Sequence, residues 1–240
     1  MVVFLCLPDI DNCSLGYTQR PIHISYTRKN NDRTKLQSAL LALTQAGLAA
    51  LAERNHAAGS IKTPAAESHF LCNWMVQSLK EKRFSKLLAE DLTRWIREGR
   101  SLGAGAKLPE VLQRIQAQYL PAINNAAVGQ SLQNLIAELQ AENWLVILDC
   151  EVSGKLKLDS QGQNSLVIST EQYQQHLLDG KLIKPITLYI RADEQLIAQF
   201  AVKHTLLFSQ GDKKASCIKH HKAYRLYPDN QQPALALLKA

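Results

Sequence analysis

The chain has 240 residues, of which 46% are apolar and 20% are charged, and its formal net charge is +7. This composition is typical of a folded globular protein and excludes general disorder, and a chain of this length can bury a core without disulfides or a structural metal. No apolar run approaches the roughly 18 residues of a membrane-spanning helix, and the apolar residues 1–7 are too short for a signal peptide. We therefore expect a cytoplasmic protein without a membrane partner.

The cysteines are five in number and form no Cys-x-x-Cys pair. An odd, scattered set is typical neither of a disulfide framework nor of a four-cysteine zinc site. We therefore expect reduced thiols, and neither a metal nor another cofactor. The five residues are Cys6, Cys13, Cys72, Cys150 and Cys217.

The N-terminal residues 1–33 show no sustained hydrophobic period, and we expect a poorly ordered extension there. From Thr34, leucine and alanine recur every three or four residues, which predicts an amphipathic helix that ends within residues 56–59. Thr63 followed by Pro64 predicts the start of a second helix, because threonine caps the exposed N–H groups and proline fits the first turn.

The next elements are also predicted to be helical. Ser85 is expected to cap a third helix that Gly99 ends, and a fourth helix is expected to begin near Pro109. These helices predict a helical domain over residues 34–120. Residues 121–129 then interrupt the helical pattern and mark the predicted domain boundary.

Beyond that boundary a helix is predicted at residues 132–139, and the hydrophobic period then changes to that of strands. We expect strands at residues 144–148, 155–158, 165–168, 186–190 and 223–227, the last at a sheet edge, and a helix at residues 194–203. The predicted fold class is therefore α+β, in which an N-terminal helical bundle precedes a small sheet covered by helices. The α+β domain is expected to cover residues 130–230.

Three motifs in the helical half resemble those of a known family. Residues 63–71 read TPAAESHFL, residues 82–84 read KRF and residues 99–106 read GRSLGAGA. In these motifs the chain is similar to the bacterial domain-of-unknown-function family numbered 2913, over residues 39–227. The resemblance implies that the three motifs belong to one domain and that the genetic context is that of accessory genes of mobile elements. It implies no activity.

The basic residues are concentrated in two segments of the chain. Residues 62–114 carry 10 Lys and Arg against 6 Asp and Glu, and residues 205–225 carry 5 against 1, whereas residues 115–151 carry none against 4. Two such patches would attract nucleic acid or another polyanion if they adjoin in the fold, and the alternative is that they only solvate helix surfaces. The residues expected to bind the polyanion are Lys82, Arg83, Lys86, Arg100, Lys107, Lys213, Lys214, Lys219 and Lys222.

An enzyme is a second possibility, with a pocket near the start of the second helix. The residues expected in this pocket are Glu67, His69 and Trp74. His69 with its carboxylate neighbour could supply a general base, and Arg100 could hold an anion. However, Glu67 and His69 are two positions apart and point to different sides of a helix. The structural alternative is that Glu67 stabilises the helix start and His69 packs against its neighbours, and the sequence contains no established catalytic motif.

Three further features have a functional and a structural interpretation. Gly99, Gly103 and Gly105 either let backbone N–H groups approach a phosphate or form turns. Four side chains near the C-terminus are of types that can bind a metal. We expect them to belong to a basic surface cluster rather than a metal site, because lysines surround them and no second ligand pair completes a tetrahedral set. These side chains are His204, Cys217, His220 and His221. A protein–protein adaptor or inhibitor that uses an apolar face of the helical half remains a third possibility.

Overall fold

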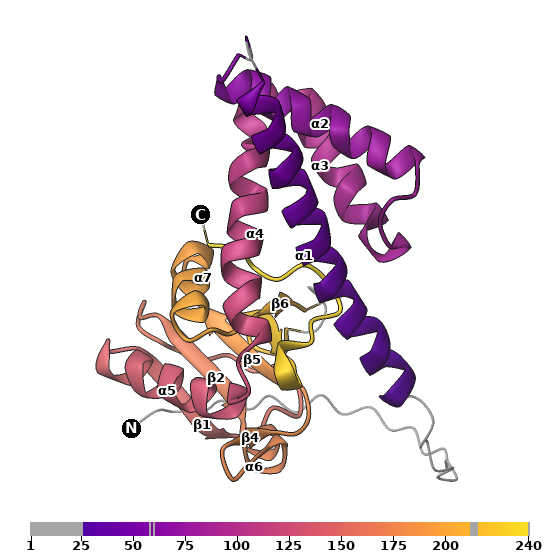
Figure 1. Cartoon of the computed structure of the whole chain (residues 1–240). Helices are drawn as coiled ribbons and strands as arrows, with labels where there is room; N and C mark the ends of the chain where they lie inside the picture. The colour runs from indigo at the N-terminus through magenta and orange to yellow at the C-terminus, as the bar shows by residue number, and fades with distance from the viewer. Residues whose placement is uncertain (1–25, 58, 60, 212–215, 240) are drawn as a thin grey trace, which may run out of the picture.

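The computed structural model describes residues 26–57, 59, 61–211 and 216–239, and it describes side chains from residue 36 onward. In these residues the fold is α+β, as predicted, with five α-helices before a small mixed sheet (Figure 1). We call residues 26–123 the helical unit and residues 124–239 the sheet unit. Within the described part of the chain, no helix is long and apolar enough to cross a membrane.

The helical unit consists of four α-helices and two short 3₁₀ turns. They are α1 (Tyr26–His56), α2 (Pro64–Lys80), η1 (Lys86–Leu88), α3 (Ala89–Leu102), η2 (Gly103–Ala106) and α4 (Leu108–Ile123). The first helix begins at Tyr26, eight residues before the predicted start at Thr34, so residues 26–33 of the predicted extension are helical. Residues 1–25 of that extension lie outside the described part of the chain.

The start of α2 confirms the local prediction. The Thr63 Oγ1 accepts a hydrogen bond from the Ala66 N–H at 3.3 Å, and Pro64 occupies the first helical position. Ser85 caps η1 rather than α3 itself, through a 3.3 Å bond from the Leu87 N–H, and η1 leads directly into α3. Side-chain caps and a proline without an N–H therefore set the local starts of these elements.

Gly99 does not end α3, which corrects the prediction. The helix continues to Leu102, and Gly103, with φ of 56°, follows it. Gly99 is buried inside the helix, and a Cβ atom there would lie 3.1 Å from the side chains of Cys72 and Leu108. The glycine thus allows α2 and the first turn of α4 to approach α3 closely.

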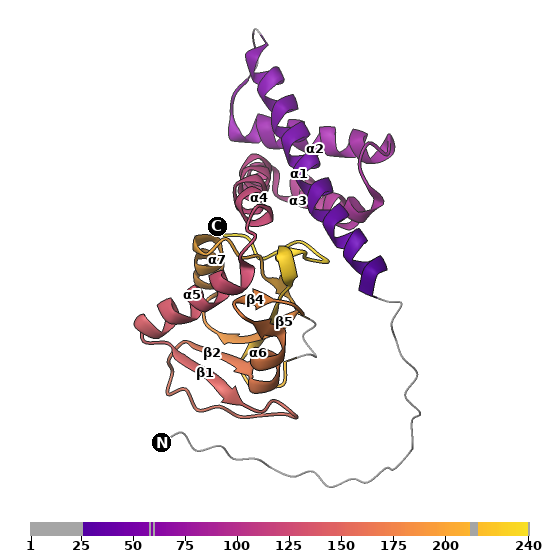
Figure 2. The same ribbon diagram turned by 60° about the horizontal axis from the view of Figure 1, so that its bottom comes forward.

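The helical unit has its own hydrophobic core, in which α1 packs against α4 and α2 packs against α3 (Figures 1 and 2). Its fully buried side chains include Leu40, Leu43, Leu71, Met75, Leu88, Leu112, Ile115 and Tyr119. Because these positions recur at helical spacing, one face of each helix is buried and the opposite face is left for solvent.

The first helix of the sheet unit is α5, and the described residues of this unit form a five-stranded sheet and a two-stranded hairpin. Its elements are α5 (Val128–Ala141), β1 (Leu145–Cys150), β2 (Ser165–Ser169), α6 (Thr170–His176), β3 (Leu177–Leu178), β4 (Lys181–Leu182), β5 (Ile186–Arg191), α7 (Glu194–Lys203), β6 (Ser209–Gln210), β7 (Lys222–Leu226) and η4 (Pro228–Asn230). The sheet order is β1-β2-β5-β7-β6, with β1 and β2 parallel and the other pairs antiparallel.

The two faces of the sheet are buried differently. Alternate side chains such as Leu166, Leu188 and Tyr224 face the core shared with α5 and α7. Their neighbours Val167 and Tyr189 face a smaller cluster on the opposite side, beneath loops. The alternation follows from the two-residue period of a strand, which places successive side chains on opposite faces.

Two strand predictions need correction. Residues 223–227 were expected to form an edge strand, but β7 lies between β5 and β6, and β6 is the edge. Residues 155–158 form no strand, and only an isolated parallel bridge joins Leu156 to Ile218. In both cases the neighbouring strand, and not the local hydrophobic alternation, decides the structure, because a strand is stable only where a neighbour completes its hydrogen bonds.

A buried asparagine joins the two units. The Asn230 Nδ2 donates to the Ala122 carbonyl at 2.8 Å and to the Thr205 carbonyl at 3.0 Å, while its Oδ1 accepts from the Leu207 N–H at 2.9 Å. Its side chain is fully buried, so these bonds replace bonds to water.

Residues 231–239 then return to the helical unit and lie along α4. The Ala236 N–H donates to the Tyr119 hydroxyl at 2.7 Å, and the Gln118 Nε2 donates to the Leu237 carbonyl at 2.7 Å. The same segment contacts the sheet unit, because the Leu237 N–H donates to the Phe208 carbonyl at 2.8 Å. The units are therefore tied together by hydrogen bonds at the end of α4 and along this returning segment.

Candidate functional site

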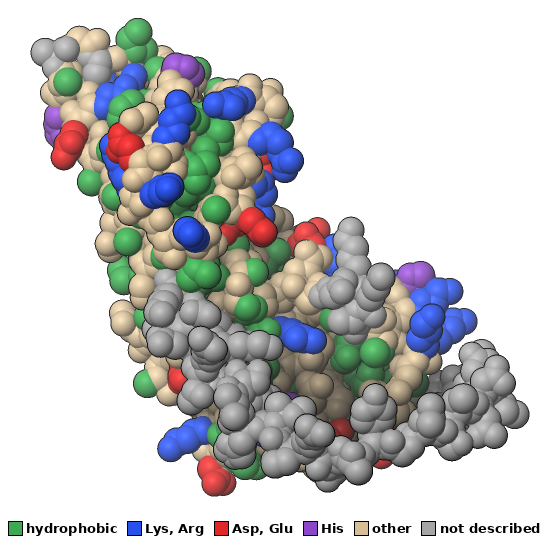
Figure 3. All heavy atoms as spheres, turned by 90° about the vertical axis from the view of Figure 1, so that its right-hand side faces the viewer, with side chains coloured by type: hydrophobic (Ala, Val, Ile, Leu, Met, Phe, Trp, Pro, Cys, Tyr) green, Lys and Arg blue, Asp and Glu red, His purple; other side chains and the backbone are tan. Residues whose placement is uncertain are grey.

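The positive charge of the protein lies in the helical unit. Residues 26–123 carry 15 Lys and Arg against 8 Asp and Glu, which equals the net charge of +7 of the whole chain, whereas residues 124–240 carry 12 against 11. On the face shown in Figure 3, Lys and Arg side chains gather over the helical unit, and a second, smaller group lies apart from them on the sheet unit. The surface potential is therefore uneven between the two units.

Three of the predicted polyanion-binding residues form ion pairs. Arg83 pairs with Glu81, Lys107 lies 3.8 Å from the carboxylate of Glu110, and Lys222 lies 2.6 Å from the carboxylate of Glu194. All these side chains are exposed to solvent, so each pair is screened and adds little stability. A bound anion would compete with a neighbouring carboxylate at these three positions.

The other predicted residues are placed differently. Lys82, Lys86, Arg100 and Lys219 are exposed, and each makes no ion pair with any residue that the structure describes. Lys213 and Lys214 lie outside the described residues. Three of these four predicted residues belong to the helical unit, around the turn between α2 and α3 and at the end of α3.

The outer face of α3 forms a shallow cavity of about 390 Å³, which we call the α3 groove. Its lining consists of Thr93, Ile96, Arg97, Arg100 and Ser101. Leu92 and Trp95 are buried on the opposite side, so the amphipathic pattern of α3 fixes which residues face outward.

Arg94 stands next to the groove but is engaged elsewhere. Its guanidinium lies 2.6 Å from the carboxylate of Asp91 and 5.9 Å from the centre of the Trp95 ring. Burial raises the pKa of the Asp91 carboxyl, and the positive charge of Arg94 opposes this shift. Arg94 is thus held by its own helix, unlike Arg97 and Arg100.

The predicted catalytic group is not assembled by any contact among the described residues. The Glu67 Oε1 accepts a hydrogen bond from Asn55 at 2.7 Å, and the His69 ring accepts one from Asn73 at 3.3 Å. Arg100 lines the α3 groove instead. The first two side chains are thus engaged by neighbouring helical residues, and no hydrogen bond joins either of them to Arg100.

Trp74, the fourth residue of the predicted pocket, has a packing role. Its ring lies 5.7 Å from that of Phe84, and it also packs beside Gly47, where an added Cβ atom would lie 3.2 Å from the indole. Trp74 therefore anchors α2 against α1 and the turn that precedes η1.

His221 and Ser165 form a buried pair in the sheet unit. The His221 Nε2 lies 2.9 Å from the Ser165 hydroxyl and the Nδ1 lies 3.0 Å from the Lys219 carbonyl. Because a carbonyl only accepts, the Nδ1 carries the proton, and Nε2 accepts from Ser165. Burial lowers the pKa of His221, and the nearby charge of Arg191 lowers it further. Both side chains are inaccessible to a substrate, so the pair is structural.

His204 is engaged by a carboxylate on α5. Its Nε2 lies 2.6 Å from Glu138, which also binds Lys203. The Lys203 hydrogen bond, more than that of His204, holds the pKa of Glu138 below its ordinary value. In the described residues, no group of three or more His, Cys, Asp and Glu side chains is arranged to hold a metal.

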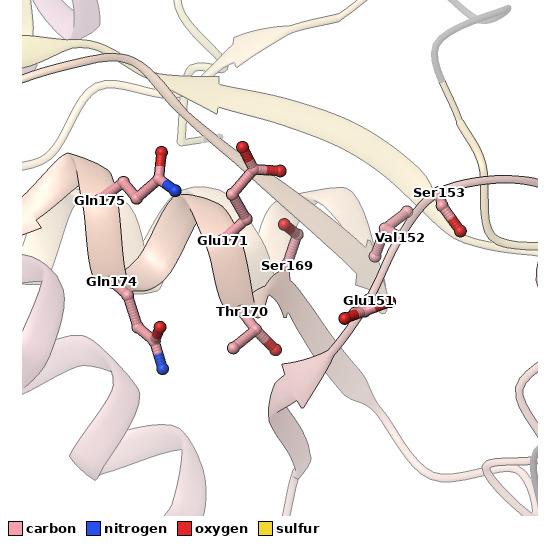
Figure 4. Close-up of a pocket in the computed structure, with 8 residues that line it drawn as sticks. All are labelled: Glu151, Val152, Ser153, Ser169, Thr170, Glu171, Gln174 and Gln175. Carbon is pink, nitrogen blue, oxygen red and sulfur yellow. The ribbon is translucent and has the colours of Figure 1, made fainter.

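A second hollow, the acidic pocket, lies where the parallel strands β1 and β2 end (Figure 4). It has a volume of about 470 Å³ and is lined by Glu151, Val152, Ser153, Ser169, Thr170, Glu171, Gln174 and Gln175. In Figure 4, Glu151 lies across from the first turn of α6, which carries Thr170 and Glu171. Two carboxylates and no Lys, Arg or His form the lining, so the pocket repels phosphate groups.

The sequence analysis identified only part of the α3 groove and none of the acidic pocket. Arg97 was not singled out, although the spacing of Arg94, Arg97 and Arg100 is that of a helical stripe and was readable from the sequence. The acidic pocket had no such signal, because Glu151 and Glu171 are 20 residues apart and meet only through the parallel pairing of β1 and β2.

Comparison with known proteins gives one match. A family model described as a protein of unknown function, DUF2913, matches residues 35–239, which is most of the chain. Neither a curated protein nor a solved structure matches the sequence.

Proposed function

The chain belongs to the DUF2913 family of proteins of unknown function, and from its charge distribution we propose that it is a non-enzymatic protein that binds nucleic acid through the helical unit. The observation that carries this proposal is the location of the entire positive excess in residues 26–123. Charges that only solvate a surface would be expected in both units, and in the sheet unit they are balanced.

The turn between α2 and α3 supplies the proposed contacts together with α3. Lys82 and Lys86 are exposed there without ion pairs to described residues, and Arg83 lies beside them. Long cationic side chains on a protruding helical hairpin reach phosphates without rearrangement of the core. We retain Lys219 and Lys222 of the second predicted group as a secondary contact on the sheet unit, while Lys213 and Lys214 lie outside the described residues.

The acidic pocket supports this choice of surface. Its carboxylates Glu151 and Glu171 lie in the sheet unit. A polyanion is repelled there and attracted to the helical unit, so the uneven potential orients the encounter.

The proposal is tested by the anisotropy of a labelled DNA duplex of about 20 base pairs at about 50 mM and about 200 mM salt. If about four phosphates are contacted, the affinity falls by about 100-fold between these salt concentrations, because bound counterions are released on binding. The Lys82→Glu/Lys86→Glu variant should bind more weakly, and the matched Lys155→Glu/Lys157→Glu variant of the sheet unit should bind nearly as the parent does. No complex at the lower salt concentration, or an equal loss in both variants, contradicts the proposal.

A protein partner is the second candidate, and exposed leucines favour it. Leu79 and Leu87 have 37% and 43% of their surface exposed beside the half-buried Phe84. An apolar contact of this kind is insensitive to salt, unlike the phosphate contacts. Binding of a purified partner that is unchanged between the two salt concentrations would favour an adaptor or inhibitor over a nucleic-acid-binding protein.

We also propose a bacterial cytoplasmic setting and an association with mobile elements, as the family resemblance implies. Fractionation of cells that make the protein tests the location, and the genes that flank its own test the association.

A further inference from the structure

We propose that Arg97 and Arg100 form a clamp for one phosphate group of a nucleic-acid backbone, in the α3 groove. This inference rests on the proposed function and deepens it, because it names the site and the chemical group that the site holds. Positions three apart on an α-helix are neighbours on its surface, and both arginines line the same cavity.

The two guanidinium groups have no counter-ion in the described residues. Each lacks an ion pair and a side-chain hydrogen bond there, whereas Arg94 on the same helix is held by Asp91 at 2.6 Å. The contrast lies within two turns of one helix, so it does not reflect a general shortage of acids. The donors of Arg97 and Arg100 are thus directed to solvent and available to a ligand.

Adjacent like charges on a helix repel each other, and an anion between them removes that repulsion. A phosphate fits this role because its oxygens accept paired hydrogen bonds from planar guanidinium groups. The position of Arg100 in the last turn of α3 is favourable for a cation, so the clamp is compatible with the helix that carries it.

The other polar side chains of the groove have no free hydrogen-bond donor to offer an anion. The Thr93 hydroxyl donates to the Ala89 carbonyl at 2.6 Å, and the Ser101 hydroxyl donates to the Glu98 carbonyl at 3.3 Å. Their protons are therefore used within α3, and Ile96 supplies an apolar floor. The affinity of the groove for an anion depends on the two arginines alone.

The experiment compares variants in the full chain with labelled DNA, both as a duplex and as a single strand. The variants are Arg97→Gln, Arg100→Gln, the Arg97→Gln/Arg100→Gln double variant, the charge-preserving Arg97→Lys/Arg100→Lys variant, and Lys155→Gln/Lys157→Gln as the control that removes the same charge from the sheet unit. The arginines are exposed, so circular dichroism should show an unchanged fold in every variant.

The expected result is non-additive. If both arginines hold one phosphate, the double variant lowers affinity about tenfold and reduces the slope of log affinity against log salt by about 1, the value for one lost phosphate contact. Each single variant should lose nearly as much affinity for DNA as the double variant. The Arg97→Lys/Arg100→Lys variant should also bind DNA more weakly although its charge is unchanged, and the affinity of the control variant should change little. The duplex and single-strand arms show which form presents the phosphate.

Two outcomes separate the clamp from the proposed function. If the parent chain binds DNA and the double variant binds it equally well, the clamp is wrong and the proposed function stands. The same conclusion follows if the double variant reduces the salt slope by about 2 and the losses of binding free energy in the two single variants add up to that of the double variant. If the parent chain binds neither DNA form at about 50 mM salt, the clamp and the proposed function both fail.

Discussion

The helical unit and the sheet unit use their polar side chains in opposite ways. In the helical unit, cations extend from helix faces that the core does not need, as Arg97 and Arg100 do on α3. In the sheet unit, polar groups are part of the fold, as in the buried contact of Ser165 with His221. The exposed cations of α3 can therefore be replaced without loss of the fold, whereas replacement of the buried pair in the sheet unit would disturb it.

The largest expected effect comes from removal of the residue that joins the units. Asn230→Ala leaves the Leu207 N–H buried without an acceptor, at about 2 kcal/mol, and removes the hydrogen bonds to the Ala122 and Thr205 carbonyls, at about 1 kcal/mol each. Each carbonyl keeps another donor, from the backbone or the side chain of Asn125. The free energy of unfolding should therefore fall by about 4 kcal/mol. Urea denaturation followed by circular dichroism and by tryptophan fluorescence should then show two separate transitions. Trp74 and Trp95 report the helical unit, and Trp144 reports the sheet unit.

The exposed Asn124 provides the control for this prediction. Asn124→Ala should change the free energy of unfolding by less than about 0.5 kcal/mol, as is usual for surface positions. An equal effect of the two substitutions would show that Asn230 does not join the units.

A smaller effect is expected from close helix packing, and it should differ between the units. At Gly129 in α5, an added Cβ atom would lie 2.3 Å from the backbone oxygen of Gly180, which cannot move without displacement of the β3–β4 hairpin. Gly129→Ala should therefore destabilise the protein by about 3 kcal/mol. At Gly99 the close atoms belong to side chains, and the gain in helix propensity of about 1 kcal/mol offsets part of the strain in Gly99→Ala.

Thermal unfolding of the two alanine variants measures this difference between the units. Gly154→Ala is the matched control, since nothing lies within 4 Å of its added Cβ atom. If Gly99→Ala is as damaging as Gly129→Ala, then the helical core is no more tolerant than the sheet unit.

The smallest expected effect concerns pH and belongs to the sheet unit. Because the pKa of His221 is lowered in the fold from its ordinary value of 6.5, the unfolded chain binds a proton there more readily than the folded chain. The stability from this residue is therefore complete above about pH 6.5 and falls as the pH decreases toward the lower, folded-state pKa. Urea denaturation at about pH 7.5 and about pH 5.5 should show this loss.

The His221→Gln variant removes the titrating group. It should be about 1 kcal/mol less stable at neutral pH, because a hydrogen bond with Ser165 is lost, but its stability should depend less on pH over the same range. A parallel pH dependence in the variant and the parent would assign the acid sensitivity to other groups.

Local chemistry was sufficient to predict the start of α2, and a long-range contact explains the failure at Gly99. Thr63 and Pro64 act within one turn, so the sequence alone indicated α2. Gly99 resembled a helix end, but its role depends on Cys72 and Leu108, which are distant in sequence.

The sheet was harder to predict for the same reason. The β7 strand is internal only because the two-residue β6 pairs with its far side, and so short a strand leaves no periodic signal. α6 and the β3–β4 hairpin were missed because they are also too short for a period to be recognised.

The candidate site was only partly readable. Arg100 and the basic turn near Lys82 were expected from charge alone, because exposed helix faces follow a simple period. Which cations keep a counter-ion was also readable from helical spacing but was overlooked: Asp91 stands three residues before Arg94, whereas no acid stands three or four residues from Arg97 or Arg100.

The return of residues 231–239 to α4 has a consequence during synthesis. All four helices of the first unit have been translated by residue 123, but their core also contains Leu207 and Ala236, and Tyr119 awaits the backbone of Ala236. At about 5–20 residues per second, the ribosome needs roughly 5–25 s to supply the missing part. During this interval part of the apolar surface of the nascent helices stays exposed to solvent. A chaperone that covers this surface would therefore help the protein most at this stage.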